Sequence, residues 1–292
     1  MSLTTTEILS QPDTWARAIA EAPAASTFFG LPGERVLFLG CGTSAFVAES
    51  LAHLRERAGL GETDAAYASE WRPGRRYDRI VAITRSGTTT EILDALAAAD
   101  PETVKVAIVA VSGKPVDALV SDTLVLDYAD EQSVVQTRFP TTLLAAARAV
   151  YGYDVSGLVE QGRASLSVPF GLDVTRFDHF VYLGSGWTHG LAQEAALKVR
   201  EAAQAWSESY PLLDYRHGPI AVAGERSLVW IMGPVEPQLV ADIEAVGATV
   251  VVGDDDPLVQ LAEAQRLAVA LAESRGLNPD TPRHLTRSVI LG

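Results

Sequence analysis

The chain has 292 residues, 48% of them hydrophobic, and a formal net charge of -14. It is long enough for two domains that each bury a core, and too apolar to be disordered. The acidic excess excludes a general field that attracts nucleic acid or an anionic membrane surface, so an anionic ligand needs local backbone and side-chain donors.

The few residues that could hold a metal or form a disulfide are scattered. Cys41 is the single cysteine, which excludes an internal disulfide, and the five histidines show no metal-ligand spacing. Residues 1–21 carry polar and charged side chains throughout, and no apolar run of membrane-spanning length follows. We therefore expect a cytoplasmic protein without metal, cofactor, nucleic-acid partner or membrane partner.

Apolar runs and helical stretches alternate along the whole chain, after an opening helix expected over about 6–22. Strands are expected at 35–39, 65–68, 79–84, 105–111 and 123–126, with helices at 43–58, 89–99 and 138–151. A second cycle has expected strands at 179–183, 205–208, 228–232 and 249–252, with helices at 188–203, 237–245 and 258–274. This alternation is typical of α/β folds whose parallel sheets are covered on both faces. The last segment, 276–292, contains two prolines and no helical period, which predicts an extended tail on the body.

The two cycles begin with nearly the same motif. The segment 36–44 (VLFLGCGTS) returns at 180–188 (FVYLGSGWT), and each copy reads as a buried strand, a Gly-X-Gly turn and a helix start. Free amide groups and the helix dipole at such a turn favour anions. The repeat predicts two similar domains, 1–165 and 166–292, with the boundary between Ser156 and Asp173, where glycine and proline accumulate.

A hydroxyl-rich turn, 83–91 (ITRSGTTTE), follows the third expected strand. Thr84, Ser86 and Thr89 could present hydroxyls and amides to a phosphate, although a strand-to-helix turn capped by Thr88 or Thr89 needs no ligand. Arg85 favours the phosphate interpretation, because a guanidinium binds phosphate with two hydrogen bonds.

A similar hydroxyl pair, Thr43 and Ser44, follows the first Gly-X-Gly turn. Loops at the carboxyl ends of neighbouring strands converge where open α/β sheets bind ligands. The first turn lacks the third glycine of a dinucleotide fingerprint, which makes a dinucleotide the weaker alternative.

The helix expected at 188–203 places Glu194, Lys198 and Glu201 on one face, at spacings i, i+4 and i+7. A solvated stripe with a Glu194–Lys198 pair is the plainer interpretation. The following loop, 206–219, holds aromatic and acidic side chains and His217 before a Gly-Pro break, and such loops concentrate functional groups. A carboxylate base and a histidine can open a sugar ring and move a proton between adjacent carbons.

Together these stretches resemble the sugar isomerase (SIS) domain family, which includes the isomerase half of glucosamine-6-phosphate synthase. The landmarks are LGCGTS (39–44), ASEWR (68–72), SGTT (86–89), EAALKVRE (194–201), RHGP (216–219) and PRHLTRSV (282–289). They occur in the family's order and span nearly the whole chain, so the set is far more specific than any one member.

The resemblance implies two tandem flavodoxin-like SIS domains, each with three αβα layers and a parallel sheet. It also implies a homodimer with a shared active site and no cofactor. The implied phosphate and hydroxyl ligands are Thr43, Ser44, Thr84, Arg85, Ser86 and Thr89, and the implied sugar-lining residues are Val134 and Gln136. Glu201 is the implied base beside Lys198, and His217, reaching over from the neighbouring subunit, is the implied ring-opening group.

Three departures from the synthase shape the functional expectation. The chain shows no amidotransferase segment with an N-terminal cysteine, so we do not expect it to draw ammonia from glutamine. Arg287, among the substrate-contacting candidates, replaces the lysine that forms a Schiff base in the synthase tail, and a guanidinium forms no practical imine. Arg85 replaces a glutamine, which puts the hydroxyl and phosphate pattern of the substrate in question.

These features favour an enzyme, an aldose-ketose isomerase that deaminates a 2-amino-hexose 6-phosphate to a ketose 6-phosphate and ammonia. A plain isomerase and a fructosamine-6-phosphate-type deglycase are alternatives within the enzyme class. The alternative of another class is a sugar-phosphate-binding regulatory protein without catalysis.

Overall fold

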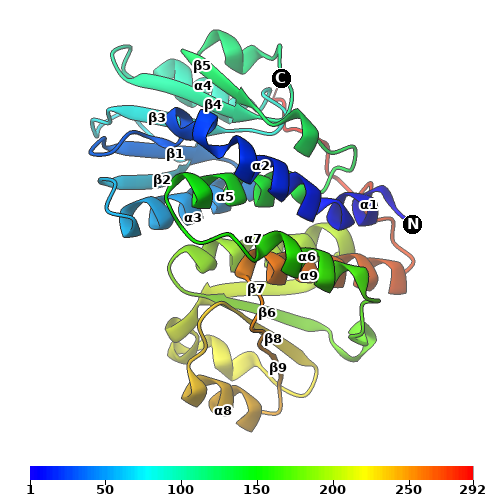
Figure 1. Cartoon of the computed structure of the whole chain (residues 1–292). Coiled ribbons are helices and arrows are strands. Elements are labelled where there is room, and N and C mark those ends of the chain that lie inside the picture. Colours follow the sequence, from blue (N-terminus) through cyan, green and yellow to red (C-terminus); the bar gives the residue numbers. More distant parts are fainter. Residues whose placement is uncertain (292) are drawn as a thin grey trace. The chain divides into compact units, whose positions relative to one another are not determined.

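The computed structural model describes residues 1–291, in which the chain forms two compact units (Figure 1). The sheet-A unit comprises Ser10–Glu131, Arg138–Val159 and the chain from Thr286 onward. The sheet-B unit comprises Met1–Leu9, Gln132–Thr137 and Glu160–Leu285. The expectation of an α/β protein with two parallel sheets is confirmed.

Sheet A has five parallel strands in the order β2-β1-β3-β4-β5. They are β2 (Thr63–Tyr67), β1 (Val36–Gly40), β3 (Arg79–Ile83), β4 (Val104–Val109) and β5 (Asp122–Val125). On one face, Leu37 and Leu39 pack against Ile92 and Leu96 of α4 (Thr90–Ala98). The other face is covered by α3 (Thr43–Arg57), α5 (Arg138–Val150) and α2 (Gln11–Ala25) (Figure 1). Because both faces are covered, every residue of β1 and β3 is buried.

Sheet B repeats this arrangement with four parallel strands in the order β7-β6-β8-β9. They are β7 (Trp206–Pro211), β6 (His179–Gly184), β8 (Ser227–Met232) and β9 (Thr249–Val251). Leu183 and Ile231 pack against Tyr215 of the 3₁₀ helix η5 (Leu212–His217) and Ile243 of α8 (Pro237–Ala245). The remaining helices of this unit are α1 (Leu3–Leu9), α7 (Trp187–Ala203), α9 (Pro257–Ser274) and, from Glu160 onward, α6 (Leu158–Ser167). Shorter 3₁₀ helices of the chain are η1 (Ser26–Phe29), η2 (Pro115–Ala118), η3 (Asp127–Ala129), η4 (Val174–Arg176) and η6 (Pro219–Val222).

The two Gly-X-Gly turns have the same backbone conformation. Gly42 has φ 53° and ψ -128°, and Gly186 has φ 56° and ψ -129°. A Cβ on Gly40 or Gly184 would lie 2.2 Å from backbone atoms of the following helix, at Ser44 and Thr188 respectively. Both helices therefore start directly against the end of their strand, which is possible only when these strands end in glycine.

Two expectations about local structure need correction. The expected opening helix is two helices, because α1 ends at Leu9 and α2 restarts at Gln11 with Pro12 in its first turn, where proline is tolerated. The stretch interpreted as a linker contains α6, although Gly162 lies inside it. Ser165 of α6 donates a hydrogen bond of 2.6 Å to Glu263 of α9, so tertiary contacts support a helix that local propensity does not predict.

The C-terminal stretch forms no helix or strand between residues 277 and 291, as its prolines predict. Within residues 1–291, no helix has both the length and the apolar character needed to span a bilayer.

Candidate functional site

The predicted phosphate-binding residues lie at the carboxyl edge of sheet A. The loop after β3 carries Thr84, Ser86 and Thr89, and the turn after β1 carries Thr43 and Ser44 at the start of α3. Because β1 and β3 are parallel neighbours, both loops leave the sheet at the same edge. The structure thus brings both sets of hydroxyl-bearing residues to the same edge of sheet A.

The loop 84–89, here called the hydroxyl loop, has donors that the protein does not use. The Oγ1 atoms of Thr84 and Thr89 lie 3.4 Å apart, and Ser86 Oγ accepts a hydrogen bond of 3.0 Å from Thr88 Oγ1. Thr89 is the N-cap of α4, but its side chain makes no capping hydrogen bond. Within residues 1–291, the backbone N–H groups of Ser86 and Thr89 donate no hydrogen bond. A group of hydroxyls and free amides at a helix start favours an anion.

Gly87 gives this loop its shape. Its φ is +67°, and a Cβ there would lie 2.6 Å from Cβ of Lys114. The carbonyl of Gly87 accepts a hydrogen bond of 3.2 Å from the N–H of Val116 in η2. The loop is therefore held by backbone packing that a larger residue would disrupt.

Cys41 lies between the glycines of the first turn and is half-buried. Burial, reinforced by the negative charge of Glu91 in the first turn of α4, raises the pKa of the Cys41 thiol to about 11. The thiol is therefore protonated and unreactive near neutral pH.

Arg85, predicted as a phosphate ligand, is enclosed by protein. Its side chain is 1% exposed, and Nη1 lies 3.4 Å from Oε2 of Glu131. Its Nη2 donates a hydrogen bond of 3.1 Å to the carbonyl oxygen of Arg287. The guanidinium thus binds two partners in its own unit.

Arg287 is anchored in the same unit. Its guanidinium forms an ion pair with the carboxylate of Asp130 and donates a hydrogen bond to the carbonyl oxygen of Glu131. The Arg287 side chain thus supplies a positive charge, but a guanidinium has no nucleophilic amine that could form an imine.

The predicted acid-base residues meet on α7 in the sheet-B unit. Lys198 Nζ lies 2.6 Å from Oε2 of Glu201 and 3.3 Å from Oε1 of Glu194. The side chains of Lys198 and Glu194 are 1% exposed, whereas that of Glu201 is 19% exposed. The alternative of a solvated stripe is therefore wrong, and Glu201 is the most accessible group of the three.

Val134 and Gln136 belong to the sheet-B unit as well. The carboxylate of Glu7 in α1 accepts a hydrogen bond of 2.5 Å from the N–H of Gln132, and the backbone carbonyl of Asp280 accepts one of 3.1 Å from the N–H of Val134. Gln136 Oε1 is buried without a hydrogen-bond partner among residues 1–291. A buried acceptor without a partner is costly, and a ligand hydroxyl would satisfy it.

His217 ends η5 and is exposed. Among the described residues it makes no hydrogen bond or ion pair with Lys198 or Glu201. Its neighbour Arg216 pairs instead with Glu236 at 2.7 Å and with Asp242 at 2.8 Å. These contacts fix the end of η5 and leave the imidazole at the surface.

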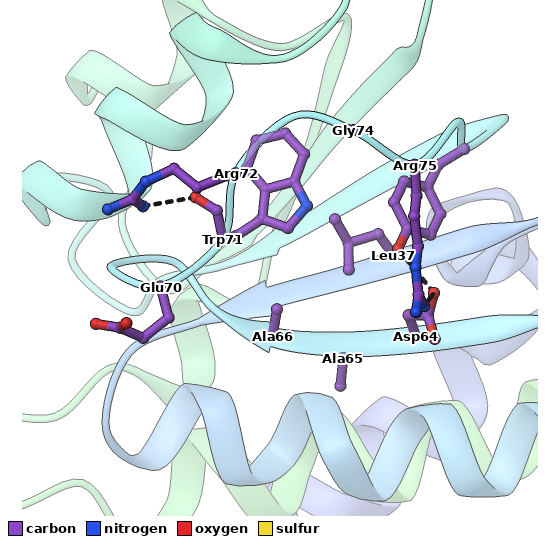
Figure 2. Close-up of a pocket in the computed structure, with 10 residues that line it drawn as sticks. Leu37, Asp64, Ala65, Ala66, Glu70, Trp71, Arg72, Gly74 and Arg75 are labelled. Atoms are coloured by element: carbon purple, nitrogen blue, oxygen red, sulfur yellow. Dashed lines mark hydrogen bonds and ion pairs between the residues drawn. The ribbon is translucent and has the colours of Figure 1, made fainter.

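A hollow of about 390 Å³ beside β2 contains the landmark residues Trp71 and Arg72 (Figure 2). Figure 2 shows Arg72 turned back onto the carbonyl oxygen of Trp71, while Arg75 reaches Asp64, 3.0 Å away. Tyr77 also donates a hydrogen bond to Asp64, and burial raises the pKa of Tyr77 to about 12. Both arginines are thus bound to protein, and this hollow holds none of the predicted site residues.

Sequence reasoning missed the carboxylates that hold the predicted residues in place. Glu131 is fully buried beside Arg85, and Glu7 is 4% exposed beside the 132–137 loop. Their partners lie 46 and 125 residues away, so no local spacing marks them.

Comparisons with known proteins agree with this geometry, although no family model matches the chain. The glutamine--fructose-6-phosphate aminotransferase [isomerizing] of Methanothermobacter thermautotrophicus is 29% identical, over 88% of this chain and 51% of its own. The chain spans about half the length of such curated relatives.

Two solved structures have the same fold over nearly the whole chain. The glucosamine-6-phosphate deaminase of Thermotoga maritima is 28% identical with a TM-score of 0.86, covering 99% of this chain and 100% of its own. The tagatose-6-phosphate ketose/aldose isomerase of Escherichia coli has a TM-score of 0.80 at 21% identity, covering 100% of this chain and 96% of its own. These similarities to an isomerizing aminotransferase, a glucosamine-6-phosphate deaminase and a sugar-phosphate isomerase confirm the resemblance to the sugar isomerase (SIS) domain family found in the sequence.

Proposed function

We propose that the protein is an aldose-ketose isomerase for a 2-amino-hexose 6-phosphate, which it converts to a ketose 6-phosphate and ammonia. The observation that carries this proposal is the group on α7, where buried Lys198 holds the more accessible carboxylate of Glu201 at 2.6 Å. An ammonium at this distance pairs with the carboxylate and holds it in one orientation, and a positioned carboxylate can serve as a proton-abstracting base. The similarity to a glucosamine-6-phosphate deaminase supports the choice of substrate.

The phosphate is proposed to bind the hydroxyl loop and the turn after β1. The residues assigned to it are Thr43, Ser44, Thr84, Ser86 and Thr89. Within residues 1–291 the N–H groups of Ser86 and Thr89 donate no hydrogen bond, which supports this assignment. In a protein with a net charge of -14, such local N–H donors can bind an anion that the overall charge does not attract. Arg85 remains a predicted residue of the phosphate site. Its guanidinium contacts Glu131 and the carbonyl oxygen of Arg287.

The remaining steps are assigned to side chains of the sheet-B unit. His217 protonates the ring oxygen and opens the sugar, and Gln136 and Val134 contact the open chain. Glu201 removes the C2 proton of the amino aldose, and the C1=C2 enaminol takes a proton back at C1. The C2 imine that results adds water and expels ammonia, so Arg287 does not have to form an imine.

We also propose that the two units are tandem flavodoxin-like SIS domains of three αβα layers, divided as 1–165 and 166–292. The shared strand order and the matching Gly42 and Gly186 turns support a duplication. A cytoplasmic homodimer in which His217 serves the neighbouring subunit completes the proposal, and the exposure of His217 is compatible with it. Sedimentation and mixed dimers of His217→Ala with Glu201→Gln chains test this arrangement. Complementation of the two inactive variants supports it, and two inactive variants that stay inactive when mixed contradict it.

The deciding experiment measures ammonia and ketose phosphate formed from glucosamine 6-phosphate and from galactosamine 6-phosphate. Glu201→Gln is expected to abolish both products, while Glu263→Gln, a glutamate paired with Arg266 on α9, keeps them. Full activity of Glu201→Gln removes this residue from its role. Substrate binding without turnover by the wild type favours the regulatory alternative, and cleavage of fructosamine 6-phosphate favours the deglycase.

A further inference from the structure

Arg85 directs its guanidinium to groups of the protein itself. Nη1 faces the carboxylate of Glu131 at 3.4 Å, and Nη2 donates to the carbonyl oxygen of Arg287 at 3.1 Å. Arg85 and Glu131 are both buried. Arg85 thus connects a buried carboxylate to the main chain of the C-terminal segment, residues 286–291.

Glu131 completes this connection from the other side. Its Oε1 accepts a hydrogen bond of 2.8 Å from the N–H of Arg138 at the start of α5, which fixes the carboxylate. Its backbone carbonyl accepts a hydrogen bond from the Arg287 guanidinium, which also pairs with Asp130. Arg287 is therefore held at its main chain by Arg85 and at its side chain by residues 130 and 131.

Beyond Arg287, the C-terminal segment lies along the hydroxyl loop and the first turn of α4. Thr88 Oγ1 lies within hydrogen-bond distance of Ser288 Oγ, at 3.1 Å, and the N–H of Thr90 donates to the carbonyl of Val289 at 3.3 Å. The N–H of Leu291 donates in turn to Thr90 Oγ1 at 3.0 Å. The segment thereby contacts the loop whose Ser86 and Thr89 N–H groups donate no hydrogen bond within residues 1–291.

We propose that Arg85, together with Glu131, is a positioning residue that anchors the C-terminal segment against the hydroxyl loop, and that it acts on the phosphate site through this segment and not as a phosphate ligand. This inference rests on the proposed phosphate-binding role of the loop. A loop that is already held in place loses less conformational entropy when an anion binds. Loss of the Arg85 and Glu131 contacts therefore weakens phosphate binding indirectly.

Hydrogen exchange of the full chain without ligand, followed by mass spectrometry of the C-terminal peptide, tests the anchor directly. Arg85→Lys keeps a cation beside Glu131 but lacks the second nitrogen, Nη2, that donates to the carbonyl oxygen of Arg287. Glu131→Gln removes the carboxylate. Both are expected to speed exchange in residues 286–291 by about tenfold or more, because local opening governs exchange there. Arg79→Lys is the matched control, since Arg79 makes a two-pronged pair with Glu34 at the other end of β3, away from the segment.

Titration with inorganic phosphate separates an indirect role from direct contact. The anchor predicts that Arg85→Lys and Glu131→Gln both weaken phosphate binding several-fold, although Glu131 has the wrong charge to be a ligand. Unchanged exchange of the segment in both variants overturns the proposal. So does weaker phosphate binding in Arg85→Lys when Glu131→Gln binds phosphate normally and the segment stays protected in both variants. If the wild type binds no phosphate, the proposed function fails, while the exchange data still decide whether Arg85 anchors the segment.

Discussion

Lys198 lies between two carboxylates of its own helix, with Nζ 2.6 Å from Glu201 and 3.3 Å from Glu194. Glu194 and Lys198 are almost completely buried, and Glu201 keeps a 19% exposed side chain. The ammonium of Lys198 therefore faces two carboxylates, of which that of Glu201 is the more exposed to water.

Replacing this cation removes the ammonium that both carboxylates face. Lys198→Met is expected to lower the free energy of unfolding by about 3–5 kcal/mol, as is usual when one partner of a buried ion pair is removed. The double variant Lys198→Met/Glu194→Gln is expected to recover part of that loss, because it removes the buried charge that remains. Urea denaturation at neutral pH measures both, and a Lys198→Met protein as stable as the wild type would contradict the role of the ammonium.

Gln136 gives a prediction in which stability and binding change in opposite directions. Its buried Oε1 lacks a partner among residues 1–291, so Gln136→Met is expected to keep or raise the unfolding temperature of the free protein. The same change is expected to raise KM for the sugar phosphate by about tenfold, because one ligand hydrogen bond is lost. Gln193→Met is a stability control, since Gln193 Oε1 is also buried without a described partner. An unchanged KM would remove Gln136 from the sugar site.

Cys41 gives a prediction about reactivity and pH. Because burial raises the pKa of its thiol from 9.0 to about 11, the folded protein at pH 8 holds about 100-fold less thiolate than an ordinary cysteine. We expect slow alkylation by iodoacetamide in the folded protein, fast alkylation in urea, and an intermediate rate in Glu91→Gln. The stabilisation linked to this group is complete below about pH 9 and is lost as the pH rises through about 11. Fast alkylation of the folded wild type at pH 8 would contradict the raised pKa.

The sequence predicted features that depend on local chemistry. The Gly-X-Gly turns, the alternation of strands and helices, and the grouping of Lys198 with Glu201 follow from spacing within one element, and the structure contains all of them. Arg85 was different. The neighbouring hydroxyl residues predicted a phosphate ligand at this position. Its partner Glu131 lies 46 residues further along the chain, so no local pattern indicated the pair. Helix α6 was missed for the same reason, since Glu263 supports it from a distant helix.

The duplicated glycine turns allow one prediction to be tested twice in the same molecule. A Cβ on Gly40 or Gly184 would lie 2.2 Å from backbone atoms, whereas one on Gly42 or Gly186 would meet nothing within 4 Å. Gly42→Ala and Gly186→Ala are therefore expected to cost about 1–3 kcal/mol, for a backbone conformation that residues with a Cβ rarely adopt.

The strand-ending glycines are expected to cost more, because neither a strand nor a helix backbone can yield by an ångström without losing its own packing. Gly40→Ala and Gly184→Ala should each lower the free energy of unfolding by about 3 kcal/mol or more. Urea denaturation followed by circular dichroism compares the four variants with the wild type. Equal losses at Gly40 and Gly42, or at Gly184 and Gly186, would show that backbone conformation and not close contact dictates glycine at the end of β1 and β6. Similar ratios in both pairs would show that the same physical constraint acts at equivalent places in the two units, as the matching contacts at Gly40 and Gly184 predict.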